Sequence, residues 1–263
     1  MYHNHPVRID IAGTVESIAQ IDHNLLYKCY NTFYNPANMF ICIAGNVDTD
    51  KVLKMIDQKI KDSEPLEISR FFEEEPESIV KSYTEQKLAV AQPMFCFGFK
   101  EAIDKPECSV KEKICTALLL EIIAGDSSPL YKTLTDEGLI NDEFATEHFC
   151  GYGYSAVIFE GESKNPRLVA EKIRNEIERI KTEGIDKKLF SAVRCGMYGN
   201  AIRLFDSVEG IAMQMVDCAM LDSGLFDDIK YLKSVTTDDV YKRLLKLDGE
   251  KAVLSVISPM EEV

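Results

Sequence analysis

The chain has 263 residues, 44 acidic and 30 basic side chains, and a formal net charge of −14. Such an acidic surface argues against nucleic acid or an anionic membrane as the partner, and no apolar run reaches the roughly 20 residues that a membrane span needs. The eight cysteines are scattered without a C-x-x-C pair. We therefore expect buried free thiols in a cytoplasmic protein rather than a disulfide framework.

Polar cap residues predict three helices in the first 61 residues. Thr14 begins a Thr-x-x-Ser motif that is typical of a short helix. Asp22 is predicted to cap a helix from Asn24 to Phe33, and Asp48 is predicted to cap a helix that ends near Lys61. The second helix is expected to bury Leu25, Leu26, Cys29 and Phe33.

The short apolar run Met39–Gly45, closed by glycine, predicts a buried strand. A strand needs partners in a sheet, and the residues before it offer none. It must therefore pair with another copy of the chain, with a second domain, or with nothing. We favour association between chains, because an unpaired apolar strand is adhesive.

Residues 62–84 have the composition of an exposed acidic linker. They include Ser63, Pro65, Pro76 and the run Glu73–Glu75, with few apolar residues. We place a domain boundary here, between residues 1–61 and 85–263, and expect trypsin to cut the folded chain first at Arg70 or Lys81.

Residues 85–263 predict an α+β domain, with helices packed on one face of an antiparallel-rich sheet. Pro93 suggests an edge position or a bulge, and the glycines of 144–162 suggest a hairpin. The predicted strands are 88–91, 94–100, 144–162 (as the hairpin) and 251–257; the predicted helices are 106–124, 130–137, 167–182, 187–205, 208–221 and 237–247.

Several stretches resemble M16 metallopeptidases, the pitrilysin and processing-peptidase family. They are His3–Ile18, Phe33–Met39 with the Ala44-Gly45 strand end, and Gly125–Leu139, which contains Ser-Ser-x-Leu-Tyr before Glu-x-Gly-Leu. The resemblance is strongest to a bacterial subgroup, some members of which are associated with modification of elongation factor P. It implies that the chain comprises the end of a first, zinc-binding domain and a second domain of similar fold.

Active members of the family bind zinc through H-x-x-E-H and a distant glutamate. The four histidines are His3, His5, His23 and His148, and none begins this motif. His3-x-His5 lacks a third ligand, so hydrogen bonding in a loop is the expected role. We therefore predict no catalytic residue and no metal ligand, no zinc cofactor in this chain, and no peptide cleavage. Because the motif precedes the point that matches Met1 in the family, we expect a truncated form or a fragment.

Other candidate residues also favour structural roles. Ser127-Ser128 is not surrounded by G-x-S-x-G, so a helix N-cap is expected, and no cysteine has an identifiable histidine partner. In active relatives an arginine and a tyrosine hold the substrate backbone. The resemblance places these positions at Thr135 and Asn141, and neither residue can replace the charge-assisted grip of an arginine.

The leading hypothesis is a zinc-less M16-like segment that is non-catalytic alone and helps to enclose a peptide chamber. Its expected partners are a peptide or unfolded polypeptide, bound along a sheet edge, and an M16-type subunit or a second copy of the chain. One alternative is a structural subunit that stabilises an active M16 partner without contacting substrate. Another is an unrelated α+β enzyme.

Overall fold

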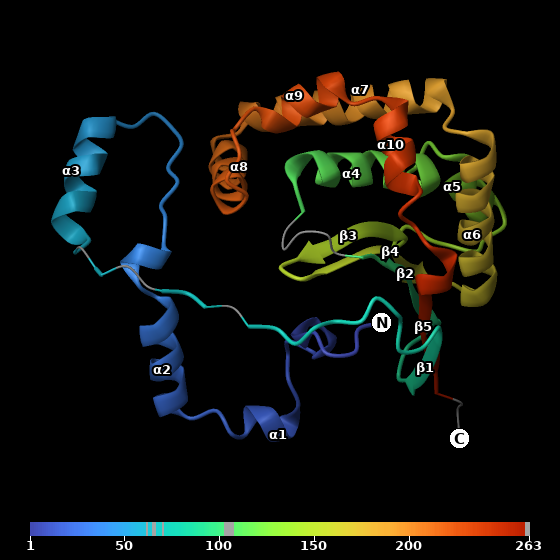
Figure 1. Ribbon diagram of the computed structural model, residues 1–263, viewed down its shortest axis with the longest axis horizontal. Coiled ribbons are helices and arrows are strands. Elements are labelled where there is room, and N and C mark those ends of the chain that lie inside the picture. The colour runs from blue at the N-terminus through green and yellow to red at the C-terminus, as the bar shows by residue number, and fades with distance from the viewer. Residues whose placement is uncertain (62, 65–66, 70, 103–107, 261–263) are drawn as a thin grey trace. The chain divides into compact units, whose positions relative to one another are not determined.

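The computed structural model describes residues 1–61, 63–64, 67–69, 71–102 and 108–260. The chain forms two compact units (Figure 1), which are described separately. The first comprises Met1–Arg8, Glu73–Ile202 and Phe226–Val263; the second comprises Ile9–Phe72 and Arg203–Leu225. The sequence division at 62–84 stays a prediction, and its residues 62, 65, 66 and 70 lie outside the described residues.

The first unit is built on a five-stranded sheet with the order β1-β5-β2-β4-β3. The strands are β1 (Tyr83–Leu88), β2 (Met94–Lys100), β3 (Ala145–Gly151), β4 (Tyr154–Glu162) and β5 (Ala252–Pro259). Among the described strands only β1 and β5 pair in parallel, so the predicted antiparallel-rich sheet and the hairpin are confirmed. The edge position suggested by Pro93 is wrong: β2 is the central strand, and Pro93 is the residue immediately before it.

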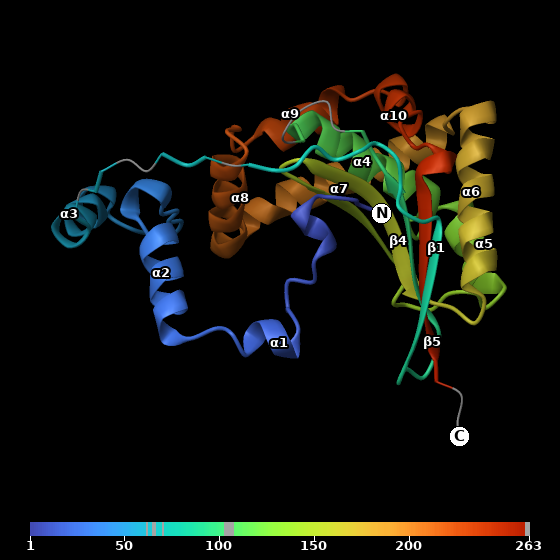
Figure 2. The same ribbon diagram turned by 60° about the horizontal axis from the view of Figure 1, so that its bottom comes forward.

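Helices pack on one face of this sheet (Figures 1 and 2), as the α+β prediction requires. The α-helices of this unit are α4 (Val110–Ala124), α5 (Pro129–Asp136), α6 (Pro166–Glu183), α7 (Lys187–Arg203), α9 (Asp227–Ser234) and α10 (Thr237–Leu244). Helices α4 and α6 contact the strands, and α9 and α10 pack on α4. The unit also contains the 3-10 turns Pro6–Arg8 and Gly249–Lys251. The sequence interpretation missed α9. It started α4 at Pro106, which lies outside the described residues.

Strand alternation separates a buried sheet face from an open one. Phe97 pairs with Phe159, and Phe99 pairs with Val157. These side chains are fully buried in the core that α4 and α6 complete. The opposite face, called the open face below, is covered only in part: Cys96 is half-buried, whereas Lys100 on the same face is buried beside the Tyr2 ring.

Among the described residues no single helix has the length and apolar composition needed to cross a membrane. The bent pair α4 and α5 meets those two criteria jointly.

The second unit contains α1 (Val15–Ile18), α2 (His23–Phe33), α3 (Thr49–Lys59), α8 (Val208–Met220), and the 3-10 turns Pro36–Asn38 and Leu204–Asp206. The caps predicted at Thr14, Asp22 and Asp48 are confirmed, because each side chain accepts a backbone N–H of its helix.

Two predictions for this unit are wrong. Residues 39–45 form no strand, since no described segment pairs with them. Helix α2 buries none of its residues, and the side chains expected in a core are exposed: Leu25, Leu26, Cys29 and Phe33. Amphipathic periodicity marks an apolar face without showing that anything covers it.

Candidate functional site

A buried ion pair lies at the end of β2. Arg243 of α10 donates from both terminal nitrogens to Glu101, over 2.5 Å to Oε1 and 2.7 Å to Oε2. Its Nε donates to Thr116 Oγ1 over 2.7 Å, and Ser155 Oγ donates to Glu101 Oε2 over 2.7 Å. All four residues are buried. The two-bond geometry fixes α10 and α4 against β2 and β4.

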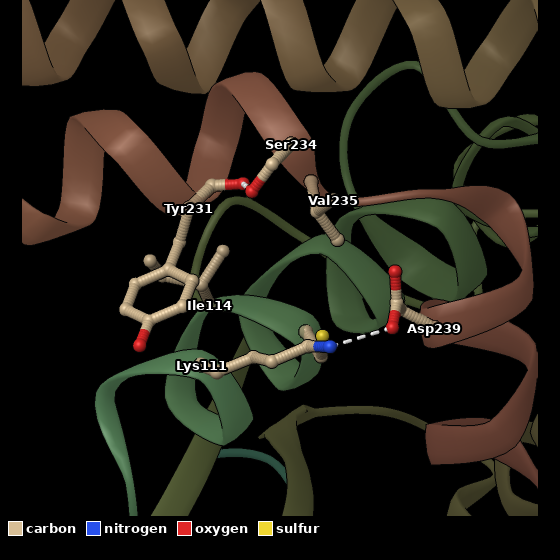
Figure 3. A pocket seen from close by; sticks show the side chains of 7 residues that line it. Lys111, Ile114, Tyr231, Ser234, Val235 and Asp239 are labelled. Carbon is tan, nitrogen blue, oxygen red and sulfur yellow. Dashed lines mark hydrogen bonds and ion pairs between the residues drawn. The ribbon is translucent and has the colours of Figure 1, made fainter.

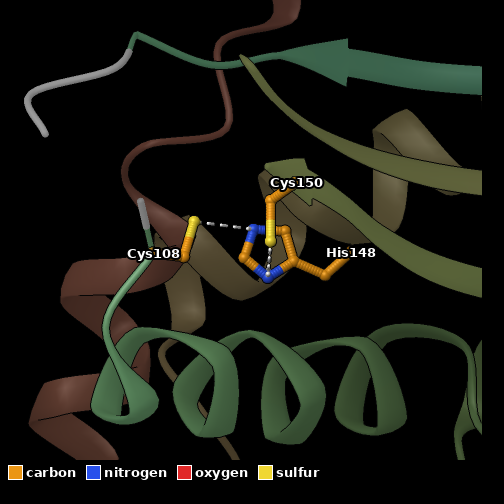
Figure 4. A group of neighbouring side chains, drawn as sticks. All are labelled: Cys108, His148 and Cys150. Atoms are coloured by element: carbon orange, nitrogen blue, oxygen red, sulfur yellow. Dashed lines mark hydrogen bonds between the residues drawn. The ribbon is translucent and has the colours of Figure 1, made fainter. Parts of the chain in front are cut away.

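Beside this pair, the fold brings together Cys108, His148 and Cys150 (Figure 4). Cys108 precedes Ser109, the N-cap of α4, while His148 and Cys150 alternate on β3 and so point to the same face. The Sγ atoms of Cys108 and Cys150 each lie 3.9 Å from a ring nitrogen of His148, Nε2 and Nδ1 respectively. One ligand atom from each residue lies within 4.8 Å of the others.

The expectation that no cysteine has a histidine partner is therefore wrong. Cys108 is 40 residues from His148 in sequence, and only the packing of α4 on β3 joins them. The His148-x-Cys150 spacing was the one available signal, because alternate residues of a strand share a face.

The two thiols have unequal acidity. A hydrogen bond from Cys108 lowers the pKa of Cys150 to about 7, although burial opposes this. The same bond, followed by burial, raises the pKa of Cys108. Cys150 is thus the thiol that ionises first.

The N-terminal segment is held by Glu75. Its carboxylate accepts the backbone N–H groups of His3, Asn4 and His5 over 2.7–2.8 Å, and the Lys100 ammonium donates to it. Burial raises the pKa of Glu75, but these hydrogen bonds, with Lys100 the strongest, outweigh it and lower the pKa to about 2.

The histidines of this segment are hydrogen-bonded, as expected. His5 Nε2 lies 3.1 Å from the carbonyl oxygen of Tyr152, and His3 Nε2 lies 3.4 Å from Ser78 Oγ. Hydrogen bonding by His3 and His5 is confirmed. Their predicted role in anchoring another half-domain stays a prediction.

Thr135 and Asn141, the two residues suggested for substrate binding, lie away from the Cys108, His148 and Cys150 cluster. Thr135 is exposed on α5, and Asn141 is exposed and donates from Nδ2 to Glu162 Oε2 over 2.9 Å. Glu162 is the last residue of β4, whereas Ser155, which contacts His148, is near its start. Seven residues of a strand separate them by roughly 20 Å. The substrate role of Thr135 and Asn141 stays a prediction. Ser128 caps α5, as expected.

One edge of the sheet is formed by β3, which pairs with β4 and with no other described strand. The register places Glu147 opposite Ile158 and Ala145 opposite Glu160, so both glutamates lie on the open face. Burial, then Glu160 and Glu147, raise the pKa of Cys96 to about 11. The open face next to the β3 edge is therefore negatively charged.

Two pockets lie where α4 meets α10 and α9. One has a volume of about 80 Å³ and is lined by Ile114, Tyr231 and Val235 beside the Lys111–Asp239 ion pair (Figure 3); the other, more open, has a volume of about 250 Å³. Sites for small organic ligands measure about 300–1,000 Å³, so neither pocket indicates a small-molecule substrate.

The zinc site of active M16 peptidases does not fit this chain. His3 contacts Ser78 in a loop, and His5 contacts the carbonyl oxygen of Tyr152, just after β3. His23 is the exposed first residue of α2, and His148 lies on β3. None belongs to an H-x-x-E-H helix, so these histidines support no hydrolytic step through that zinc.

The fold and this residue set define a peptidase-like α+β segment without the catalytic zinc ligands of its class. Residues 20–196 match the family described as the peptidase M16 inactive domain, and the chain belongs to that family. It is a non-catalytic M16-like segment.

Individual relatives support this assignment. The chain is 34% identical over 245 residues to the uncharacterized zinc protease YmfH of Bacillus subtilis (strain 168), which covers 91% of the chain and 57% of YmfH. The chain thus spans less than two thirds of that relative's length. A crystal structure of an M16-like peptidase from Alicyclobacillus acidocaldarius is similar with a TM-score of 0.89 at 30% identity, covering 99% of this chain and 63% of that one.

An inactive peptidase domain of a zinc protease from Bordetella parapertussis shares the fold. Its TM-score is 0.56 at 11% identity, with 68% of this chain and 96% of that chain covered. At this level of identity the likeness concerns the fold alone.

Proposed function

We propose that the chain is the non-catalytic part of an M16-type zinc peptidase and holds a peptide in extended form along β3. The observation that carries the proposal is the position of β3: it ends the sheet, and no described strand pairs with its outer side. The backbone groups of such an edge can accept another strand, with pockets between alternating side chains giving selectivity.

The two edges of the sheet differ in a way that favours β3. Strand β1, at the other edge, has Glu85 and Lys87 exposed, and charged side chains are a common protection against strand addition. Strand β3 carries one charge, Glu147. With Glu160 on the same face and a net charge of −14 for the chain, a peptide with basic residues is the preferred ligand.

The second unit supports a partner of the M16 type, or a second copy of the chain. Phe40, Ile41 and Ile43 expose between 44% and 54% of their surface, close together in an unpaired segment. Apolar surface of this kind is typical of protein–protein interfaces. It also supports the alternative function, a structural subunit that stabilises an active partner without contacting substrate.

A cytoplasmic location is part of the proposal. All eight cysteines are free, and free thiols in this number suit a reducing compartment.

Hydrogen exchange with a bound peptide tests the proposal against its alternative. The probe is an unstructured peptide of alternating apolar and lysine residues. Its control is the same peptide with alternate backbone nitrogens methylated, which removes the donors needed for strand pairing. We expect the first peptide alone to slow exchange across 145–151 and not across 83–88.

A charge reversal provides the matched test in the protein. Glu147→Lys should weaken binding of the lysine peptide, whereas Glu171→Lys, at an exposed position of α6, should not. Equal exchange with both peptides, or protection at β1, would contradict the proposal. Absence of binding together with tight association with an M16 partner would favour the structural alternative.

A further inference from the structure

The Cys108, His148 and Cys150 cluster has the composition of a transition-metal site. Two thiols and an imidazole form a ligand set that selects zinc-class ions over magnesium or calcium. The three come from two packed elements: the residue before the α4 cap and two alternating positions of β3. We propose that these side chains bind one zinc ion, at a site distinct from the catalytic zinc of M16 peptidases.

The distances are close to those of a tetrahedral site. With Zn–S near 2.3 Å and Zn–N near 2.0–2.1 Å, tetrahedral ligand atoms lie roughly 3.5–3.8 Å apart. The distance from Cys150 Sγ to Nδ1 is 3.9 Å, while Cys108 Sγ lies 3.9 Å from the other ring nitrogen, Nε2. With one ligand atom taken from each residue, no pair in the set exceeds 4.8 Å. Figure 4 shows the two sulfurs beside the same imidazole ring, so binding one ion requires the Cys108 side chain to turn toward the nitrogen that Cys150 contacts.

The surroundings of His148 select the nitrogen that binds. Its Nε2 lies 3.3 Å from Ser155 Oγ and 3.7 Å from Glu101 Oε2. A metal-bound imidazole commonly donates its other N–H to a hydroxyl or carboxylate, which fixes the ring. The geometry therefore assigns Nε2–H to Ser155 Oγ, which in turn donates to Glu101 Oε2, and Nδ1 to the metal beside Cys150. Cys108 completes the set by turning from Nε2 toward the same point.

Glu101 is itself fixed, so the site has a rigid support. The two-bond pair with Arg243 holds the carboxylate in place, and both residues are buried. Three protein ligands leave a fourth position, and the half-buried cysteines leave it within reach of water. The ion would join the start of α4 to the edge strand β3. Zinc at this cluster departs from the expectation of no zinc, which rested on the absence of H-x-x-E-H and of a third ligand for His3-x-His5.

Metal titration of the whole chain tests the site. The chain is purified under reducing conditions, stripped with chelator, reloaded with Zn²⁺ or Co²⁺, and dialysed. We expect about one tightly held ion per chain, and a Co²⁺ spectrum with thiolate charge-transfer and tetrahedral bands. Cys150→Ser and His148→Gln should lose both signals. Cys195→Ser, at an exposed position on α7, should keep them.

Removing the hydrogen bond from His148 to Ser155 should weaken zinc binding without abolishing it. Ser155→Ala should weaken zinc binding by roughly 10- to 100-fold, the usual effect of losing a hydrogen bond to a metal-bound histidine. X-ray absorption of the zinc-loaded native chain needs no variant, so it tests the site even if a substituted chain fails to fold. The spectrum should show two sulfur neighbours and one histidine nitrogen around the zinc.

The proposal would be overturned by less than stoichiometric zinc in the reduced native chain, by a coordination shell without sulfur, or by a Cys108–Cys150 disulfide under reducing conditions. Loss of the metal in Cys195→Ser would do so as well.

Discussion

Arg243 grips Glu101 through two parallel hydrogen bonds although the two residues are 142 positions apart in sequence. The guanidinium comes from α10 and the carboxylate from the end of β2, and less than a tenth of either residue is exposed. The pair therefore joins the last helix of the chain to the central strand of the sheet, next to the candidate metal cluster.

Removing one partner of this pair should destabilise the first unit strongly. Glu101→Gln leaves the Arg243 guanidinium buried without its counter-charge, which typically costs about 3–5 kcal/mol. Urea unfolding followed by circular dichroism measures the change. Replacing both residues with apolar ones of similar volume should restore much of the loss.

The exposed pair Lys111–Asp239 is the control for that experiment. Half of the Lys111 side chain is exposed, so water already solvates the charge and Lys111→Gln should change stability far less. If the two single variants have equal effects, the buried pair does not hold α10 to the sheet.

Acid should release the N-terminal segment through Glu75. Its folded-state pKa of about 2 lies below the unfolded value of about 4.3. A lowered folded pKa gives stability that is present above the unfolded value and is lost as the pH falls through the folded value. We expect this contribution to disappear between about pH 4.3 and about pH 2.

The comparison of Glu75→Gln with the native chain isolates this effect. The difference in urea midpoint between them should be constant above about pH 5 and should shrink over the acid window. Glu171→Gln, on the exposed side of α6, should show no such change. A constant Glu75 difference down to pH 2 would show that the carboxylate does not act through its ionised form.

Features set by neighbouring residues were predictable from the sequence. The caps at Thr14, Asp22 and Asp48 were found because a cap bonds to a backbone N–H only two or three residues away. The hairpin of β3 and β4 was found from its glycines; Gly153 has φ of 79° in the connecting turn, a conformation that glycine adopts readily.

Features set by distant residues were not predictable. Residues 39–45 have the composition of a strand, but a strand exists only where another pairs with it, and composition does not supply a partner. The candidate metal cluster could not be predicted for the same reason: the position of Cys108 over β3 follows from the packing of α4 on the sheet. A proline in a strand predicts an edge position, but Pro93 lies just before β2 and therefore removes no N–H from its ladder.

The linker prediction is tested by limited trypsin digestion. Lys81 is exposed and lies in a stretch without helix or strand, and cleavage needs such a segment. We expect the first cut at Arg70, which lies outside the described residues, or at Lys81. First cuts at Lys172 or Arg203, both on helices, would contradict the predicted division.

Association through residues 1–61 is tested by light scattering over a range of concentrations. We expect a dimer or larger assembly, and Ile41→Glu should shift it toward monomer because a charge would then face an apolar contact. Ile68→Glu, at an equally exposed position outside 1–61, is the control. A monomer at high concentration with slow hydrogen exchange across 39–44 would contradict this prediction.

The absence of catalysis by this M16 segment alone is tested by a peptidase assay on the zinc-loaded chain. A mixture of internally quenched fluorescent peptides is incubated with the native chain, and an active M16 peptidase serves as the positive control. We predict no cleavage above buffer, because no H-x-x-E-H helix is present to hold zinc beside a glutamate base. Cleavage that copurifies with the chain, stops on chelation and returns with zinc would contradict this prediction.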